Sequence, residues 1–238
     1  MIFHADSADV TFETIIDWQD DHRFLKTAFD VSVFADIARQ EIQFGYLKRP
    51  TARNTEQDKA KFEVCNHKYT DLSETRYGVS ILNDCKYGIS VKDSRMHLSL
   101  HKGGVRPDWT GDHGKHRCTY VFHPHRGGFG AEQVIKPAYE LNYPVLTADT
   151  AAAKPSFVRV DADNVVIETV KPCEDAQRAY ILRMYEAEGC HCRAALIFRD
   201  SNVKLYATDM LEENAVPCDT TLSFRPFEIK TIKVVYGE

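Results

Sequence analysis

The feature that most constrains this chain is a side-chain alternation of period two that recurs along almost its whole length. In Val10–Trp18 the apolar side chains of Val10, Phe12 and Ile16 fall on one face, with polar residues between them. Short runs of this kind, separated by clusters of Gly, Pro, Asn and Asp, are typical of antiparallel strands. The chain is therefore predicted to be all-β. The other runs are Phe29–Phe34, Glu41–Leu47, Tyr77–Leu82, Met96–Leu100, Cys118–His123, Phe157–Val160, Val165–Val170, Ala179–Tyr185, Arg193–Arg199, Val203–Ala207, Thr221–Phe224 and Lys230–Tyr236.

One segment, Gly130–Asn142, has apolar residues at helical spacing instead. A second break in the pattern, Thr147–Pro155, is rich in small residues and ends in proline, as linkers do. We therefore expect residues 1–148 to form a large multi-stranded antiparallel β-sandwich, or supersandwich. Residues 149–238 are expected to form a smaller immunoglobulin-like β-sandwich. The one short helix is expected near residues 130–142.

Composition and charge narrow the classes of function. The 30 Lys and Arg against 35 Asp and Glu give a net charge of −5 with no basic run, so we expect no nucleic-acid partner. No apolar run approaches the ~20 residues of a membrane span, and the first residues do not resemble a signal peptide. Seven scattered cysteines fit reduced thiols. A cytoplasmic protein with no membrane partner is expected.

Histidine is concentrated in the first part of the chain, where nine of the ten precede Lys154. Zinc needs three or four converging ligands, and His113–His125 is the segment that could supply them. Its histidines are His113, His116, His123 and His125. Pro124 disfavours a central strand, however, and His97 and His101 would share a strand face roughly 13 Å apart. Hydrogen-bonded or solvated histidines are therefore favoured over a metal site.

Two other short segments carry chemistry-bearing residues. Cys190 and Cys192 flank one histidine, but their CxC spacing is not the CxxC of redox motifs and zinc ribbons. We expect them to be structural residues beside a turn at Gly189. The carboxylates of Asp17–Asp21 flank Trp18, as in sites that bind and cleave sugars, although a solvated turn has the same composition.

The densest set of hydrogen-bonding side chains is Leu82–Gly88, between two predicted strands. It is either a tight hairpin with Asn-Asp turn chemistry or a loop that presents polar groups to a polyhydroxyl ligand. No nucleotide-binding or hydrolase motif such as GxxxxGK[ST], HExxH or GxSxG occurs in the sequence. The residues alone therefore indicate a multi-sheet β protein without a self-contained catalytic constellation.

Several stretches together carry a family resemblance. The longest are EIQFGYLKRPTARNT (Glu41–Thr55), KFEVCNHKYTDLSE (Lys61–Glu74) and YGVSILNDCKYGISV (Tyr77–Val91). The others are Asp17–Val31, Asp112–His125, Ala138–Pro144 and Phe224–Val234. In this order they resemble the C-terminal β region of glycoside hydrolase family 38, the class II α-mannosidases, in its cytosolic and microbial branch.

The resemblance implies a function for the parent protein. Members of this family are retaining, zinc-dependent enzymes that hydrolyse terminal α-mannosides in glycan catabolism. Their nucleophile, acid/base carboxylate and zinc ligands belong to a catalytic domain that precedes the β region. The present chain is thus expected to be an accessory region that is inactive alone, with no catalytic residue and no cofactor of its own. Zinc is expected in the missing catalytic domain, and that domain and mannose-containing glycans are the expected partners.

The resemblance also implies which residues approach the substrate, because one loop of the family's β region reaches the rim of the active site. The rim candidates are Asn83, Asp84, Lys86, Tyr87, His101 and Lys102. Relatives place an Arg near the last two positions, and Lys102 keeps the charge without the planar fork.

Two other functions remain open from the sequence. The chain could be a free-standing carbohydrate-binding β-sandwich that stacks sugars on Trp18, Trp109 or Tyr87, or a zinc protein built on His113–His125. A homo-oligomer that covers an exposed face is also possible.

Overall fold

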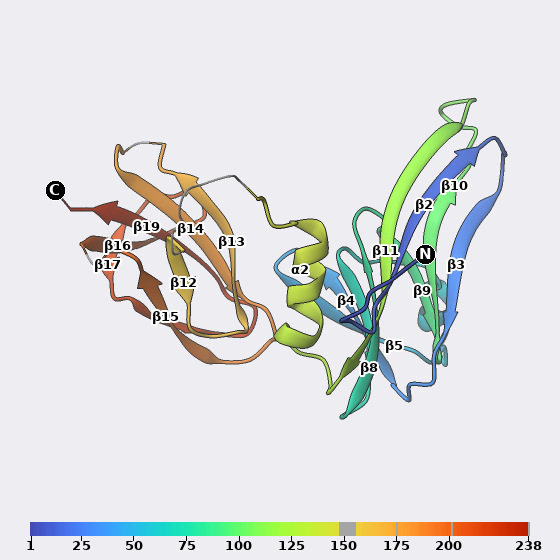
Figure 1. The fold of residues 1–238 in the computed structure, drawn as a ribbon, viewed down its shortest axis with the longest axis horizontal. Coiled ribbons are helices and arrows are strands. Elements are labelled where there is room, and N and C mark those ends of the chain that lie inside the picture. The colour runs from blue at the N-terminus through green and yellow to red at the C-terminus, as the bar shows by residue number, and fades with distance from the viewer. Residues whose placement is uncertain (148–155, 175, 201, 238) are drawn as a thin grey trace. The chain divides into compact units, whose positions relative to one another are not determined.

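The computed structural model describes residues 1–147, 156–174, 176–200 and 202–237. The chain forms two compact units, Met1–Val145 (unit 1) and Leu146–Glu238 (unit 2), and each is described by itself (Figure 1). The predicted boundary between residues 148 and 149, and most of the predicted linker Thr147–Pro155, lie outside the described residues.

Unit 1 is built from two antiparallel sheets. The larger has seven strands in the order β1-β2-β11-β8-β7-β4-β5, and the smaller has four in the order β3-β10-β9-β6. The bounds of the larger sheet's strands are β1 Ile2–Phe3, β2 Val10–Trp18, β11 Gly114–Arg126, β8 Tyr77–Asn83, β7 Tyr69–Ser73, β4 Ile37–Ile42 and β5 Gly45–Pro50. Those of the smaller are β3 Phe24–Asp30, β10 Arg95–Lys102, β9 Gly88–Lys92 and β6 Val64–Cys65.

The apolar faces of these two sheets meet in one core. Ile16, Leu72 and Ile81 enter it from the larger sheet, and Met96 and Leu98 enter it from the smaller. Period two places such residues on one face of each strand, and burying each side chain contributes roughly 1.5–3 kcal/mol. The predicted antiparallel sandwich is confirmed.

A helical segment covers part of the opposite face of the larger sheet. A π-helical turn, η1 (Ala131–Ile135), continues into α2 (Lys136–Asn142), and together they contact β7, β8 and β11. The predicted helix near residues 130–142 is confirmed, although its π-helical first turn was not predicted. No helix in the described ranges has the length and apolar character needed to cross a membrane.

A second short helix, α1 (Glu56–Ala60), was not predicted. It begins with a capping box in which the Asp58 amide donates to Thr55 Oγ1 over 3.1 Å. The Thr55 amide donates in return to Asp58 Oδ2 over 3.0 Å. The T-x-x-D spacing in the sequence was the signal for this helix start.

Unit 2 also contains two antiparallel sheets, of three strands in the order β12-β15-β18 and five in the order β13-β14-β19-β16-β17. The strands are β12 Val158–Val160, β15 Cys192–Phe198, β18 Thr221–Phe224, β13 Val165–Pro172, β14 Ala179–Glu186, β19 Ile229–Tyr236, β16 Val203–Thr208 and β17 Val216–Cys218. Leu182, Met184 and Ile232 of the larger sheet pack with Leu196 and Phe224 of the smaller in one core. The second sandwich is likewise confirmed.

Two strand predictions were wrong. The run Glu41–Leu47 contains a turn at residues 43 and 44, because Ile42 pairs with Gly45 across a tight hairpin. Because the loop has two residues, the alternation of side chains continues in phase on the far side of the turn. The turn therefore cannot be recognised from the alternation. The run Phe29–Phe34 was also too long, since β3 ends at Asp30.

Pro124 lies within β11, contrary to the prediction that it would interrupt a central strand. It pairs with Val79 of β8, whereas the last β11 pair with β2 is Phe122 with Val10. Within the part of the chain that is described, β11 therefore has a neighbouring strand at Pro124 on the β8 side alone. The missing N–H of proline costs no hydrogen bond to β2 at this position.

Candidate functional site at the rim end of unit 1

The six predicted rim residues lie in unit 1, on two strands and one turn. Asn83 ends β8, residues 84–87 turn into β9, and His101 and Lys102 end β10. The last residue of β2, Trp18, pairs with the first residue of β11, Gly114, so the end of β2 and the start of β11 lie side by side (Figure 1). We call this region, made of the β8–β9 turn, the ends of β2 and β10 and the loop 103–113, the rim end.

Asn83 shapes the β8–β9 turn. Its side chain is wholly buried, with Nδ2 donating to the His67 carbonyl over 2.6 Å. Its Oδ1 accepts the Lys86 amide over 2.7 Å, and its carbonyl accepts Asn142 Nδ2 over 3.0 Å. Asn83 therefore holds the turn in shape, and its amide is already occupied.

Asp84 attaches the turn to β11. Its amide donates to the Thr119 carbonyl over 3.1 Å, and its Oδ2 accepts the Thr119 amide over 3.0 Å. Desolvation and the adjacent Asp84 carboxylate raise the pKa of the Cys85 thiol to about 12. Because a thiolate is the nucleophilic form, this shift of the pKa disfavours Cys85 as a nucleophile at neutral pH.

Tyr87 is the aromatic residue of the β8–β9 turn and is exposed, with 51% of its surface accessible. Its ring meets that of His67 edge-on at 5.1 Å, and its carbonyl accepts the Asn66 amide over 3.0 Å. An exposed phenol held at its backbone offers both a stacking face and a hydrogen-bonding hydroxyl.

His101 is buried, with 8% of its surface exposed, between the rings of Trp18 at 4.8 Å and His116 at 4.2 Å. A bulge in β10 between Ser99 and His101 turns the histidine inward. The prediction that His97 and His101 share a strand face is therefore wrong. Among the described residues, Trp18 Nε1 and His101 Nε2 are buried without a hydrogen-bond partner.

The charge state of His101 follows from its surroundings. Burial, the neighbouring His116 and the Lys86 ammonium lower the pKa of His101. The neutral imidazole can donate one hydrogen bond and accept another, as binding of hydroxyl groups requires. The close packing requires glycine at 103, because a Cβ there would lie 2.6 Å from Trp18 Nε1.

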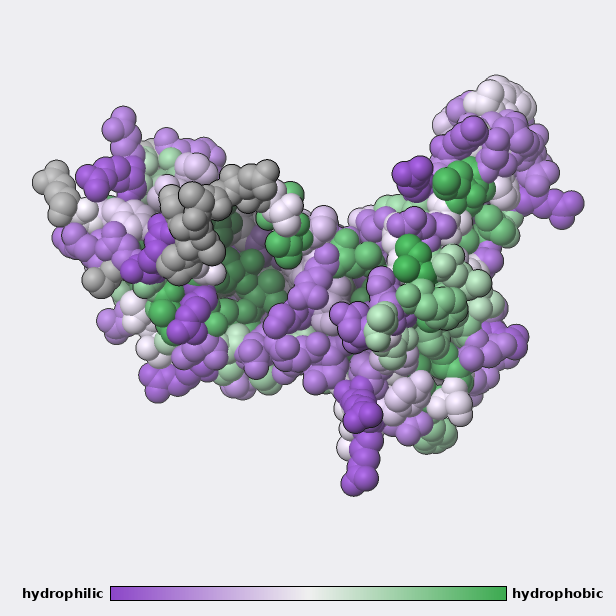
Figure 2. Space-filling model, in the orientation of Figure 1, coloured by the Kyte–Doolittle hydropathy of each residue, from purple (hydrophilic) through white to green (hydrophobic). Residues whose placement is uncertain are grey.

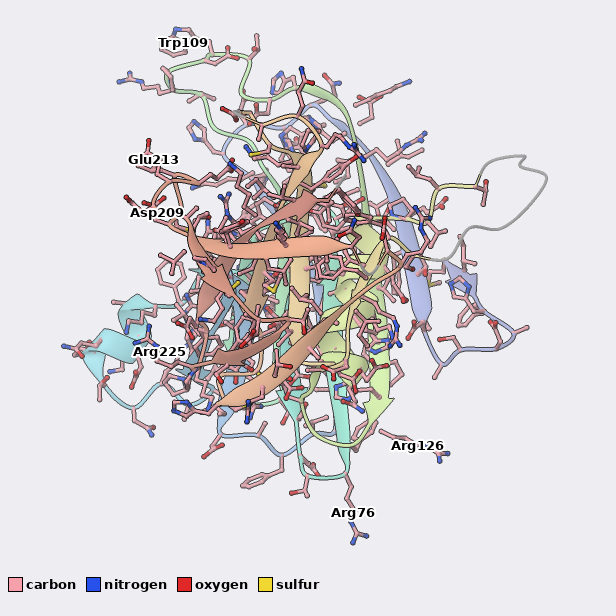
Figure 3. All side chains as sticks on the ribbon, turned by 90° about the vertical axis from the view of Figure 1, so that its left-hand side faces the viewer. Arg76, Trp109, Arg126, Asp209, Glu213 and Arg225 are labelled. Carbon is pink, nitrogen blue, oxygen red and sulfur yellow. The ribbon has the colours of Figure 1, made fainter. Side chains whose placement is uncertain are left out.

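The remaining rim groups are exposed. Lys102 ends β10, and His113 Nε2 lies 2.9 Å from Asp21 Oδ1, which connects the loops at the ends of β2 and β10. Trp109 is 72% exposed and projects from the tip of its loop, with Arg106 5.5 Å from its ring (Figure 3). Figure 2 shows mostly hydrophilic side chains at this tip.

The carboxylates around Trp18 do not form a sugar site of the predicted kind. Trp18 is 7% exposed, so its ring cannot stack on a sugar at the surface. Asp17 Oδ1 accepts Gln19 Nε2 over 2.8 Å, and Asp20 and Asp21 are exposed in the following turn. The solvated-turn interpretation describes these residues, and Trp18 is excluded as a stacking platform.

The four histidines of His113–His125 do not converge. His123 lies 2.5 Å from Asp9 Oδ1 and 2.8 Å from the Gln133 carbonyl, while His125 lies 3.0 Å from Asp71 Oδ1. In the part of the chain that the structure describes, no group of three or more His, Cys, Asp or Glu side chains is arranged to hold a metal ion. These four histidines therefore do not fit the zinc site that was considered for the segment His113–His125.

A buried polar cluster on the outer face of the larger sheet was missed by the sequence analysis. Asp71, fully buried, accepts Ser73 Oγ over 2.6 Å and Ser80 Oγ over 2.9 Å. His125 Nε2 lies 3.0 Å away and Arg39 Nη1 lies 3.8 Å away. Ser80 donates to Asp71 rather than to His125, so the cluster is not a Ser–His–Asp triad. The only signal was the presence of Asp and Ser inside otherwise apolar strands.

The fold and the rim define an all-β protein of two successive antiparallel sandwiches, with a polar, partly aromatic end on the first. Residues 1–110 match the family described as "Glycosyl hydrolases family 38 C-terminal domain". Residues 164–232 match "Glycosyl hydrolases family 38 C-terminal beta sandwich domain". The chain therefore belongs to glycosyl hydrolase family 38, and it corresponds to the C-terminal region of that family.

Individual relatives agree with this assignment. The chain is 39% identical over 239 residues to Alpha-mannosidase 2C1 of Homo sapiens and 36% identical over 252 residues to Alpha-mannosidase G of Dictyostelium discoideum. It is 34% identical over 253 residues to Alpha-mannosidase of Saccharomyces cerevisiae. These alignments cover 95%, 99% and 94% of this chain but only 23% of each relative.

A solved structure has the same fold. The crystal structure of an alpha-mannosidase from Enterococcus faecalis V583 superposes with a TM-score of 0.80 at 17% identity. The superposition covers 96% of this chain and 27% of that one.

Proposed function

We propose that this chain is the accessory β region of a retaining, zinc-dependent α-mannosidase that hydrolyses terminal α-mannosides in glycan catabolism, and that it has no such activity alone. The observation that carries the proposal is the ordered match of residues 1–110 and 164–232 to two C-terminal models of one family. Relatives named as α-mannosidases, at 34% to 39% identity, support it.

The rim end is the part that we propose to face the mannoside. Lys86 and Tyr87 on the turn, with Lys102 on β10, would donate hydrogen bonds to sugar hydroxyls, while His101 keeps the floor of the rim uncharged. Asn83 and Asp84 would act as positioning residues through the backbone contacts described above. These groups bind and orient a sugar, and the proposal assigns no bond-breaking step to them.

The catalytic domain of the parent enzyme is the proposed partner, and zinc is assigned to that domain. We also propose a cytoplasmic location, because the seven cysteines are an odd number scattered along the sequence without paired spacing, which suits a reducing compartment.

The test is release of 4-nitrophenol from 4-nitrophenyl α-D-mannoside. The chain is assayed alone, with and without Zn²⁺ or Co²⁺, and after co-expression with the part of the yeast relative that precedes its matching region. We expect turnover only from the pair. Turnover by the chain alone would overturn the proposal. Inactivity of the pair would also overturn it, provided that the yeast enzyme reassembled from its own two parts is active.

The role proposed for the rim residues is tested by substitutions in this chain when it is co-expressed with that part of the yeast relative. Lys86→Ala and Tyr87→Phe should each lower kcat/KM about threefold to tenfold, the value of one hydrogen bond to a bound hydroxyl. Lys48→Ala, at an exposed lysine of β5, is the matched control and should leave kcat/KM unchanged. Equal effects of all three substitutions would contradict a specific role for the rim.

A second candidate, a carbohydrate-binding module that acts without a catalytic domain, is favoured by the exposure of Trp109. It predicts saturable binding of mannose or mannan by the chain alone, measured by calorimetry and abolished by Trp109→Ala. Absence of binding by the unaltered chain would exclude it.

A further inference from the structure

A hollow lies at the lateral edge of unit 1, and none of the residues assigned to the rim lines it. It is lined by residues of β5 and β6, the edge strands of the larger and the smaller sheet, and by the segment around α1. The hollow is small and partly open to solvent. Its apolar wall is formed by Ala38, Val64 and Val91, and its cations are Arg49, Arg53 and Lys61.

Arg49 is half-buried and held by neutral acceptors. One of its guanidinium nitrogens, Nη1, donates to Gln40 Oε1 over 2.6 Å and to the Cys65 carbonyl over 3.2 Å. Gln40 is itself almost fully buried, so the guanidinium is fixed at the base of the hollow. Burial lowers the pKa of Arg49, which reflects a cation removed from water without a compensating charge.

Arg53 is held in the same way. Its Nη2 donates to the Phe62 carbonyl over 3.2 Å and to Ser90 Oγ over 2.9 Å. Within the described ranges, Arg49, Arg53 and Lys61 form no ion pair. The carboxylate on the wall is Asp58, whose Oδ2 accepts both the amide and the hydroxyl of Thr55 in the capping box.

An adjoining hollow provides a contrast, because it also reaches Arg53 but its three cations, Arg53, Lys92 and Arg95, face two carboxylates. Arg95 lies on its wall and forms a two-point ion pair with Asp30, and Asp93 is a second carboxylate there. Of these two hollows, the one between β5 and β6 therefore has the larger excess of positive charge, with three cations and one carboxylate on its wall.

We propose that the hollow between β5 and β6 binds a phosphate-sized oxyanion, either inorganic phosphate or the phosphoryl group of a sugar phosphate. Two guanidinium forks and one ammonium suit a dianion with tetrahedral oxygens, since arginine binds phosphate through paired N–H groups. The apolar wall lowers the local dielectric and strengthens the attraction. The inference is independent of the proposed mannosidase role, because no mannoside or catalytic domain enters it.

Isothermal titration of the 238-residue chain with inorganic phosphate at low chloride tests the proposal. We expect saturable binding with one site and a Kd of about 1 mM or tighter. Arg49→Lys and Arg53→Lys, which keep the charge but lose the fork, should each weaken binding about tenfold. Arg126→Lys, at an exposed arginine that ends β11, is the matched control and should leave the Kd unchanged (Figure 3).

Mannose 6-phosphate and mannose form two further arms of the titration. Tighter binding of the sugar phosphate than of phosphate would identify it as the source of the oxyanion, and equal binding would identify the phosphoryl group alone as the determinant. Mannose should not bind at this site. Lack of phosphate binding, or equal weakening by all three arginine substitutions, would overturn the proposal. Thermal unfolding of each variant shows whether a loss of binding comes from loss of the fold.

Discussion

Each unit buries a carboxylate among its strands, and the two carboxylates are stabilised in different ways. In unit 1, Asp71 is surrounded by side chains, including Ser80, His125 and Arg39, from several strands of one sheet. In unit 2, Glu186 at the end of β14 is bound mainly by backbone amides. The side-chain groups around Asp71 can be removed one at a time by substitution, and His125 among them can titrate. The backbone amides around Glu186 can be neither removed by substitution nor titrated.

The Glu186 cluster organises the β14–β15 turn. Its two oxygens accept five N–H bonds of 2.8 to 3.1 Å. The donors are the amides of Glu188, Gly189, Cys190 and Phe227 and the side chain of Asn164. The Cys190 thiol also contacts Glu186 Oε1 at 3.4 Å, so this cysteine has the structural place beside the Gly189 turn that its CxC spacing indicated.

The largest expected effect is that of Glu186→Gln. The side-chain NH₂ of glutamine is a donor and would face backbone N–H groups that are also donors, so hydrogen bonds would be lost. Unit 2 should therefore lose about 3 kcal/mol of stability. Both tryptophans, Trp18 and Trp109, are in unit 1. Urea unfolding followed by tryptophan fluorescence should therefore be unchanged, while far-ultraviolet circular dichroism should show an earlier transition.

The control for this substitution is Glu213→Gln, at an exposed carboxylate between β16 and β17 that carries the same charge (Figure 3). It should change neither transition. If Glu186→Gln shifts the tryptophan transition as well, the cluster is not local to unit 2.

Gly78→Ala tests the corresponding cluster in unit 1. A Cβ at this position would lie 2.4 Å from His125 Cε1 and 2.5 Å from Ser73 Oγ. His125 or Ser73 must then move away from Asp71, and the cost should be about 2 kcal/mol. The tryptophan transition in urea is the measurement.

Gly104→Ala is the matched control, because a Cβ there meets nothing within 4 Å. It should leave the tryptophan transition in place. Equal stability of the Gly78 and Gly104 variants would show that the Asp71 cluster adapts without loss, and would remove the distinction drawn between the two carboxylates.

The sequence predicted most of the strands, because period two encodes which face of each strand is apolar, but it did not predict β7. It was insufficient for the polar clusters, because the same alternation cannot distinguish a face covered by protein from one covered by water. Asp71 and Ser80 are polar residues at outward positions, and whether they are buried depends on distant segments of the chain. The β10 bulge that turns His101 inward is also invisible to local periodicity, since Leu100 and His101 simply follow one another.

The stability of the two units should depend on pH in opposite directions, through His123 in unit 1 and Glu186 in unit 2. Burial opposes the charged form of His123, but Asp9 outweighs it and raises the pKa above the ordinary value of 6.5. Its contribution is therefore complete below pH 6.5 and is lost as the pH rises through the raised value. Burial also opposes ionised Glu186, but the Phe227 and Glu188 amides lower its pKa below 4.5. That contribution is complete above pH 4.5 and is lost as the pH falls through the lowered value.

The measurement is urea unfolding at several pH values, with tryptophan fluorescence for unit 1 and circular dichroism for unit 2. The difference between the original chain and His123→Gln should shrink at alkaline pH, and the difference for Glu186→Gln should shrink in acid. His22→Gln removes an exposed histidine of unit 1 and serves as the control. Differences that do not depend on pH would contradict both assignments.

The smallest expected effect concerns the rim, where charged side chains act on one another across the β8–β9 turn. Lys86 lowers the pKa of His101, after the larger effects of burial and His116. Lys86→Gln should therefore raise that pKa slightly, as measured by an NMR titration of the His101 ring protons. Lys48→Gln removes an equal charge from β5 and should leave it unchanged. If the pKa of His101 does not change in Lys86→Gln, the β8–β9 turn does not interact with the cluster of Trp18, His101 and His116. The rim would then consist of two independent surfaces rather than one site.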